Sequence, residues 1–184
     1  MNWQLFAYLT VLSWGVYGIL LHIGRSAMPD VKPPGPELGN AGLKAFLFVG
    51  IAYFVVAVVG PLIVLKARGT NWSFSSDGMT WSFIAGAAGA LGAFTLVLAL
   101  GAAAVTMKAS APAAVMPIVF GGAPVVNAIV ALLLHPPEGG FKTLNMQFIL
   151  GILLAAAGGF LVAKYAPTNQ GAAAKPVAVE QKGQ

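Results

Sequence analysis

The chain has 184 residues, of which 58% are hydrophobic and only 8% are charged. A soluble domain carries roughly 25% charged residues, so this composition excludes an ordinary water-soluble protein and indicates one embedded in lipid. The net charge of +5 comes from basic residues scattered singly along the chain, which argues against nucleic-acid binding. There is no cysteine, which excludes disulfides, thiol catalysis and thiolate metal sites.

Five apolar stretches follow one another along the chain, and each can cross the hydrocarbon core as a helix of ~20 residues. The fifteen Asp, Glu, Lys and Arg residues all lie outside them, as expected if a charge at the bilayer centre costs ~2.5–3.5 kcal/mol. Backbone groups in hydrocarbon must bond within their own segment, which favours helices over strands. The sequence therefore predicts an all-α integral membrane bundle of about five transmembrane helices. The stretches are Leu5–Ile23, Ala45–Leu65, Phe83–Val105, Ala113–Leu134 and Met146–Ala163.

The connections between the stretches differ in composition. Residues Arg25–Lys44 contain four prolines and predict a long irregular loop. Residues Lys66–Trp81 are polar and include two tryptophans, which suit a membrane interface. The tail after Tyr165 is rich in Ala, Gln and Lys, without periodicity, and this composition is typical of disorder. We expect one transmembrane domain over residues 1–165 and a disordered tail over residues 166–184.

The basic residues predict the orientation of the chain. With five spans, three of them lie on the side of the N-terminus and seven on the side of the C-terminus. Cytoplasmic loops are enriched in Lys and Arg, so we expect a cytoplasmic C-terminus in a protein of the cell (inner) membrane. The three are Lys66, Arg68 and Lys142, and the seven are Arg25, Lys32, Lys44, Lys108, Lys164, Lys175 and Lys182.

The fourth stretch carries the strongest signs of a site. Pro117 and Pro124 each remove a backbone donor from it, and Gly121 and Gly122 lie between them. Interrupted helices at membrane depth line cavities or transporter sites, although a kinked packing helix has the same features. Asn127, one turn further on, must bond either a neighbouring helix or a ligand.

Small residues recur four apart in the third and fifth stretches. In the fifth they are Gly151, Ala155 and Gly159. Small residues let helix backbones approach closely in lipid, where no hydrophobic effect drives association. The pattern predicts close helix packing, either within the chain or in a homodimer.

Several of these motifs resemble one half of a drug/metabolite transporter of the EamA type. They are Ser110-Ala111 before the fourth stretch, Pro124 within it, and Gly151 with Gly158-Gly159 in the fifth. Ser13-Trp14-Gly15 is similar to the Trp-Gly that opens the family's first helix.

The chain departs from the family in one turn and in its length. The family's Glu-Arg turn is replaced by His135-Pro136-Pro137-Glu138-Gly139. Full-length members have two five-helix halves in inverted repeat, whereas this chain has one. Alternating access needs two repeats around a site, so the resemblance implies a half-size transporter that works as a homodimer or with a paired half.

Five residues are candidates for binding a small-molecule substrate: Trp14, Tyr17, Phe120, Pro124 and Asn127. Aromatic rings and an amide would line a weakly polar cavity. No Asp or Glu lies within a stretch to exchange a proton, so we expect a small neutral or amphipathic metabolite as substrate.

The sequence shows no nucleophile–base pair, phosphate loop or cluster of metal ligands. We therefore expect no enzyme activity, no cofactor and no metal site. The alternative to a transporter is a structural or accessory subunit of a membrane complex. A water-accessible cavity around Pro124 and Asn127 would favour transport, and a fully packed bundle would favour the accessory role.

Overall fold

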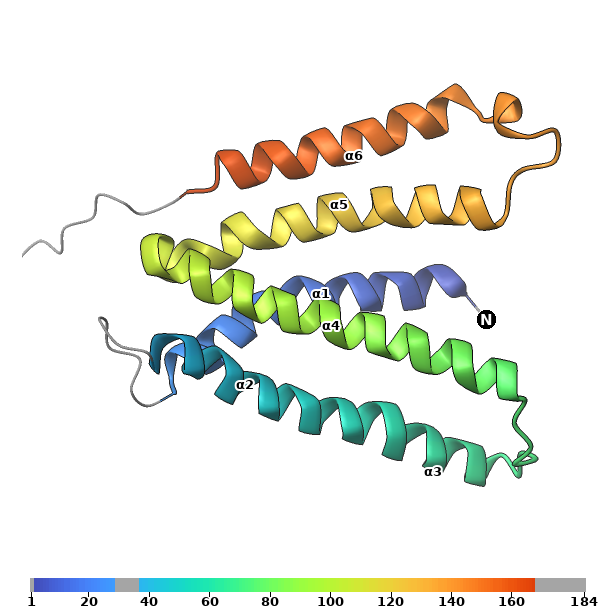
Figure 1. Cartoon of the computed structure of the whole chain (residues 1–184), viewed down its shortest axis with the longest axis horizontal. Helices are drawn as coiled ribbons and strands as arrows, with labels where there is room; N and C mark the ends of the chain where they lie inside the picture. Colours follow the sequence, from blue (N-terminus) through green and yellow to red (C-terminus); the bar gives the residue numbers. More distant parts are fainter. Residues whose placement is uncertain (1, 29–36, 168–184) are drawn as a thin grey trace, which may run out of the picture. The chain divides into compact units, whose positions relative to one another are not determined.

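The computed structural model describes residues 2–28 and 37–167, and these residues form helices without a strand among them (Figure 1). The prediction of an all-α chain is confirmed. Most of the tail that we expected to be disordered, residues 168–184, lies outside the described residues.

The first helix, α1, spans Trp3–Ser26. It starts where the Asn2 side chain accepts a hydrogen bond from the backbone N–H of Gln4 at 3.1 Å, which satisfies a donor that the first helical turn leaves unpaired. The helix ends soon after Ile23, the last residue of the first apolar stretch, and Arg25 lies in its last turn.

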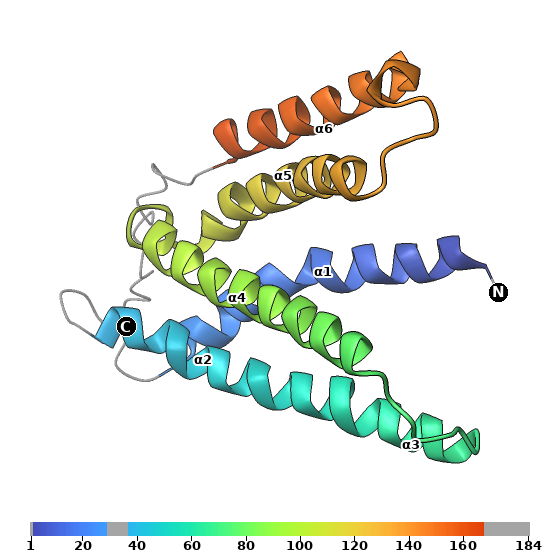
Figure 2. The same ribbon diagram turned by 45° about the vertical axis from the view of Figure 1, so that its right-hand side comes forward.

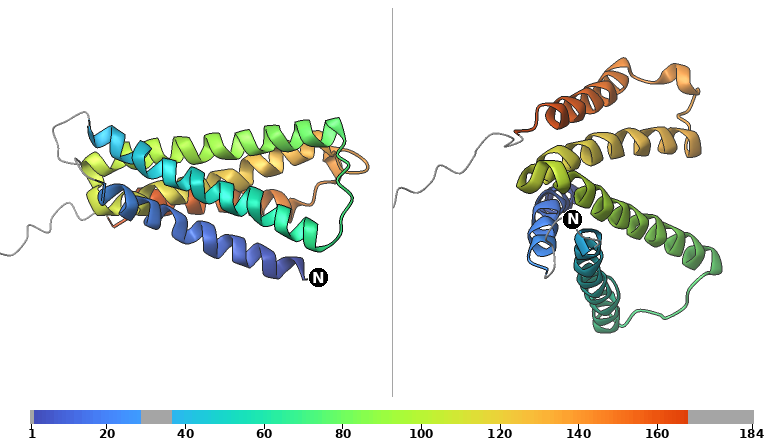
Figure 3. Two further views of the ribbon diagram at one scale, coloured as in Figure 1. Left: turned by 90° about the horizontal axis from the view of Figure 1, so that it is seen from below. Right: turned by 60° about the vertical axis from the view of Figure 1, so that its left-hand side comes forward.

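The second apolar stretch forms α2 (Glu37–Phe54) and α3 (Gly60–Ala67), which are joined by a π-helical turn at Val55–Val59. The reason for the turn is Pro61, at the start of α3. Proline has no N–H to bond the carbonyl four residues earlier and its ring crowds that carbonyl. The N–H of Gly60 instead bonds the carbonyl of Val55, five residues back. The two helices therefore run on as one long element (Figure 3).

The third and fourth apolar stretches form α4 (Ser76–Met107) and α5 (Ala111–Leu134). A short 3₁₀ turn at Lys108–Ser110 separates them, and Lys108 has a φ of 49°. This left-handed conformation is unfavourable for a residue with a side chain and cannot continue an α-helix. Helix α5 then continues through Pro117 and Pro124.

The last helix, α6, spans Met146–Lys164 and is capped by Asn145, whose side chain accepts a hydrogen bond from the N–H of Gln147 at 2.9 Å. Gly139 and Gly140, in the preceding loop, have φ values of 87° and 75°. Glycine adopts this backbone conformation without a steric penalty, so the Gly-Gly pair allows the tight turn.

Two predicted loops are too long. Helix α2 begins at Glu37, directly after the last proline of the loop that we expected to reach Lys44. Helix α4 begins at Ser76, whereas the polar loop was expected to continue to Trp81. The Ser75 hydroxyl accepts a hydrogen bond from the N–H of Gly78 at 3.2 Å and so starts this helix early. Polarity marks the edge of the apolar region, and a helix extends beyond that edge wherever a cap permits.

Four helical stretches of the described chain are long and apolar enough to cross a membrane: Trp3–Ser26, Asn40–Ala67, Ser76–Leu134 and Met146–Lys164. The third has 59 residues and contains both α4 and α5. As one helix it would be ~90 Å long at 1.5 Å per residue, three times the ~30 Å hydrocarbon core. The turn at Lys108 divides it into two helices of suitable length. The count of five spans stays a prediction.

The described residues form two compact units, one ending at Thr106 and the other beginning at Met107. In the N-terminal unit, α1 packs on α2 (Figure 2). Its buried apolar residues come from three helices and are Leu21, Ala41, Ala45, Ala93, Leu96, Val97 and Leu100. The C-terminal unit is the hairpin of α5 and α6, which lie side by side.

The N-terminal unit also buries a charge. Arg25 is only 4% exposed, although the sequence pattern indicated a flanking charge at a membrane surface. A Cβ added at Gly42 of α2 would lie 3.8 Å from the Arg25 Cδ, and one added at Gly101 of α4 would lie 3.9 Å from its Nε. The Arg25 side chain therefore lies beside both α2 and α4, within van der Waals distance of these two positions.

Candidate functional site

The helices of the C-terminal hairpin touch backbone to backbone at one point. A Cβ added at Gly121 of α5 would lie 2.8 Å from the Cα of Gly159 on α6 and 3.3 Å from the carbonyl oxygen of Ala155. A Cβ added at Gly159 would lie 2.8 Å from the carbonyl oxygen of Pro117. Only hydrogen fits at both positions. We call the contact between Gly121 and Gly159 the glycine crossing.

Two members of the row of small residues in α6, Ala155 and Gly159, take part in this contact within the chain, which is one of the row's two predicted roles, whereas a Cβ at Gly151 would meet nothing within 4 Å. Gly159 forms the crossing, and Ala155 and Gly151 continue along the same side of the helix toward the loop. The neighbouring glycines differ sharply, since a Cβ at Gly122 or at Gly158 would meet nothing within 4 Å. One glycine of each pair is required by the contact, and the other is not.

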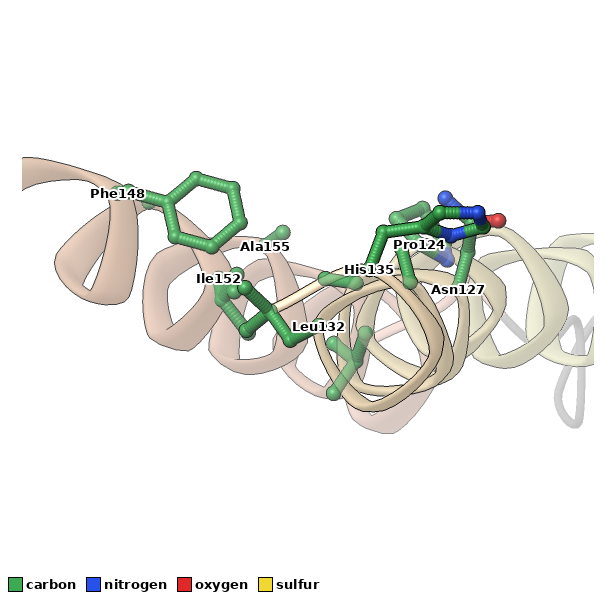
Figure 4. A pocket seen from close by; sticks show the side chains of 11 residues that line it. Pro124, Asn127, Leu132, His135, Phe148, Ile152 and Ala155 are labelled. Atoms are coloured by element: carbon green, nitrogen blue, oxygen red, sulfur yellow. The ribbon is translucent and has the colours of Figure 1, made fainter. Parts of the chain in front are cut away.

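A groove of about 560 Å³ opens between α5 and α6 on the loop side of the glycine crossing (Figure 4). We call it the hairpin groove. Ligand sites in proteins commonly have roughly 300–1,000 Å³, so the groove has room for a small molecule. The residues of the α5 side are Pro124, Val125, Asn127, Ala128, Ala131, Leu132 and His135, and those of α6 are Phe148, Gly151, Ile152 and Ala155.

Two polar side chains line this otherwise apolar groove. Asn127 is exposed and makes no hydrogen bond with the described residues, and the same holds for the imidazole of His135. Figure 4 shows both on the same side of α5, with Phe148 and Ile152 on α6. The interhelix hydrogen bond that could explain Asn127 is therefore not formed within the described chain. Its amide is available as donor and acceptor to whatever occupies the groove.

The N-terminal unit contains a smaller groove between α1 and α2, of about 280 Å³, which we call the α1–α2 groove. Tyr17 lines it, and the ring of Trp14 packs against that of Tyr17 with centroids 5.4 Å apart. The Tyr17 hydroxyl is buried without a well-formed hydrogen bond among the described residues, although Tyr53 of α2 lies near enough to affect it electrostatically. The groove lies below the usual volume of a ligand site.

The five predicted substrate-binding residues thus fall in two units. Pro124 and Asn127 lie together in the hairpin groove, and Trp14 lies against Tyr17 in the N-terminal unit. Phe120, in α5, is not among the residues that line the hairpin groove and is 39% exposed. Their role in binding a substrate stays a prediction.

Sequence reasoning missed most of the groove wall. His135 was assigned to a turn, and Ala128, Phe148 and Ile152 were part of undifferentiated apolar stretches. A signal existed in α5, because Pro124, Ala128 and Ala131 are spaced four and three residues apart and so share one helix face with His135. Nothing in the sequence indicated which helix that face would meet.

Among the described residues, no three His, Cys, Asp or Glu side chains lie close enough together to hold a metal ion. The chemistry that the hairpin groove offers is non-covalent: apolar contact along its walls and hydrogen bonding at two points. Such an arrangement can bind and orient a molecule.

Comparison of the chain with protein families, with curated proteins and with solved structures finds no match.

Proposed function

We propose that this chain is a five-span protein of the cell (inner) membrane and acts as a half-size transporter of the drug/metabolite type. In this proposal it works as a homodimer or with a paired half and carries a small neutral or amphipathic metabolite. The observation that carries the proposal is the hairpin groove, where Asn127 and His135 present unpaired polar groups within an apolar lining.

The membrane assignment is supported by where the apolar side chains lie. Large residues along every helix are exposed, among them Leu20 at 61%, Phe48 at 64%, Phe83 at 78% and Leu134 at 70%. Soluble monomers rarely expose contiguous apolar patches larger than a few hundred Å². Lipid covers such a surface at no cost, since lipid tails are as apolar as leucine.

Binding, rather than packing alone, is supported by the position of Asn127. It lies five residues after the middle of the 24-residue helix α5, about 7 Å along the axis. An amide at that depth without a partner is unfavourable. A ligand with a hydrogen-bonding group would satisfy it, and an open groove gives such a ligand access.

The accessory-subunit alternative is favoured by a different feature, on α4. A Cβ at Gly86, Gly89 or Gly92 would meet nothing within 4 Å, so this row of small residues is open to a neighbouring helix. Small residues allow close helix contact in membranes. A partner protein, or a second copy of the chain, would fit against such a face.

Reconstitution distinguishes the two functions. The purified chain is incorporated into liposomes, and flux of neutral and amphipathic metabolites is measured alongside the mass of the native complex in mild detergent. We expect a dimer or paired complex with flux that Asn127→Leu abolishes, whereas Val126→Leu retains it. Val126 is the matched control because it is 61% exposed and lies outside the groove. Full flux through Asn127→Leu would remove Asn127 from the site, and a stable complex without flux would favour the accessory role.

Orientation is tested separately with a tag at the C-terminus. Since seven of the ten basic residues lie on its side of the five predicted spans, we expect the tag to be inaccessible from outside intact cells. The loop that joins α3 to α4 should be accessible. Labelling of the tag from both sides would indicate dual topology instead.

A further inference from the structure

The hairpin groove is closed at one end by the glycine crossing. All its lining residues lie on the loop side of the glycine crossing, from Pro124 onward in α5 and up to Ala155 in α6. At the crossing itself the backbones leave no space for even one added carbon atom. A bound molecule therefore cannot continue between the helices beyond this floor.

The two polar side chains stand at defined positions along the groove. Asn127 lies six residues after Gly121, nearly two helical turns from the floor, and His135 lies at the end of α5, where the loop begins. Eight residues separate them, which corresponds to about 12 Å along a helix axis. Between them the walls are apolar, formed by Ala128, Leu132 and Ile152.

Among the residues that the structure describes, no charged side chain lines the groove. An ionised group near its floor would lack a counter-ion in a medium of low dielectric, which is unfavourable. The amide of Asn127 and the imidazole of His135 can both donate or accept hydrogen bonds, so they match uncharged polar groups.

From this pattern we infer the class of molecule that the groove takes: a linear, uncharged molecule with a hydrogen-bonding group near each end, the two groups about 12 Å apart. Its apolar middle lies against Leu132 and Ile152, its inner end bonds Asn127, and its outer end bonds His135. The inference rests on the proposed function, because it narrows the ligand of the same groove.

The test uses a homologous series of linear α,ω-diols, with the full chain in lipid nanodiscs. A diol with a diazirine at its central carbon is photolysed, and the labelled residues are located by mass spectrometry. Unlabelled diols of increasing length, and mono-alcohols of the same lengths, compete for labelling. We expect label on the groove walls and strongest competition from the diol whose oxygens lie about 12 Å apart.

Variants assign the two ends. One hydrogen bond contributes about 0.5–1.5 kcal/mol, so losing it weakens binding roughly two- to twelvefold. Asn127→Leu and His135→Phe should each lower the affinity of the matched diol toward that of the mono-alcohol. The double variant should lose the preference for length, and Val126→Leu should behave as the unmodified chain does.

The outcomes separate the two levels of the proposal. Label on the groove with no preference for length, or a preference that both variants retain, overturns this inference and leaves the groove as a binding site. If the photoreactive diol does not label the groove at all, the proposed binding function itself is overturned.

Discussion

The two compact units hold their helices together by different means. In the N-terminal unit the contacts are made by side chains: Leu100 is 1% exposed, the rings of Phe46 and Phe94 lie 5.7 Å apart, and Arg25 is buried. In the C-terminal hairpin the closest contact is made by the backbones themselves, at Gly121 and Gly159.

This difference matters for what each unit can tolerate. Side chains can change rotamer when a neighbour changes, whereas two helix backbones in contact can only move apart. The backbone contact also has a geometric consequence, because it fixes where the hairpin groove ends. A groove that must hold a ligand in one register benefits from a floor that cannot shift.

The largest effect should follow a substitution at the glycine crossing. Gly121→Val would place side-chain carbons against the Gly159 Cα and the Ala155 carbonyl. We expect a loss of about 3 kcal/mol, the upper part of the usual range for overpacking, since backbone cannot yield. The measurement is equilibrium unfolding in mixed micelles. Gly122→Val is the matched control, because it carries the same change of helix propensity into open space. Equal losses in both variants would mean that propensity, rather than the crossing, sets the stability of the hairpin.

A smaller effect is expected in the N-terminal unit, from Leu100→Ala. Truncation of a buried leucine leaves a cavity, and we expect a loss of about 2 kcal/mol, the low end for such changes, because lipid removes the part due to transfer from water. Leu98→Ala, on the same helix but 48% exposed, should change the free energy of unfolding little. If the exposed variant were as unstable as the buried one, the side-chain packing described for this unit would be wrong.

Next in size is the loss of a helix cap. Asn145→Ala removes the oxygen that accepts the Gln147 N–H at 2.9 Å and should cost about 1 kcal/mol. Asn145→Ser keeps an acceptor and should restore most of the stability. Ser75→Ala, which uncaps α4, should cost a similar amount. Thermal unfolding of the three variants measures these changes in stability. A loss of stability from only one of the two alanine variants would show that the two units differ in more than their packing.

The smallest effect on stability should come from Asn127→Leu. Asn127 makes no hydrogen bond with the described residues, so its replacement should change the free energy of unfolding by less than about 0.5 kcal/mol while ligand binding weakens. A loss within the roughly 0.6–2 kcal/mol of an interhelix hydrogen bond would instead assign it a structural role, for example across a dimer. The same unfolding measurement decides between the two.

The positions of the helices followed from the sequence, because a run of apolar residues without charge is a local feature. Such runs located α1, α4, α5 and α6 to within a few residues, apart from the early start of α4. The effect of Pro61 is local too, but the sequence did not predict the π-helical turn that precedes it within an apolar stretch. The early start of α4 was missed because a cap, rather than hydrophobicity, sets where this helix begins.

What only the tertiary structure decided is which helix faces meet. The spacing of Gly151, Ala155 and Gly159 predicted a close contact, and the Gly121-Gly122 pair was visible, but the sequence could not show that Gly121 touches Gly159 while Gly122 faces open space. Consecutive residues on a helix point about 100° apart, so the choice between them depends on the position of the neighbouring helix. The same reason explains why the sequence predicted Asn127 as a site residue and missed His135 and Phe148. The sequence gives the type of each side chain, whereas the way two helices cross decides which side chains become its neighbours.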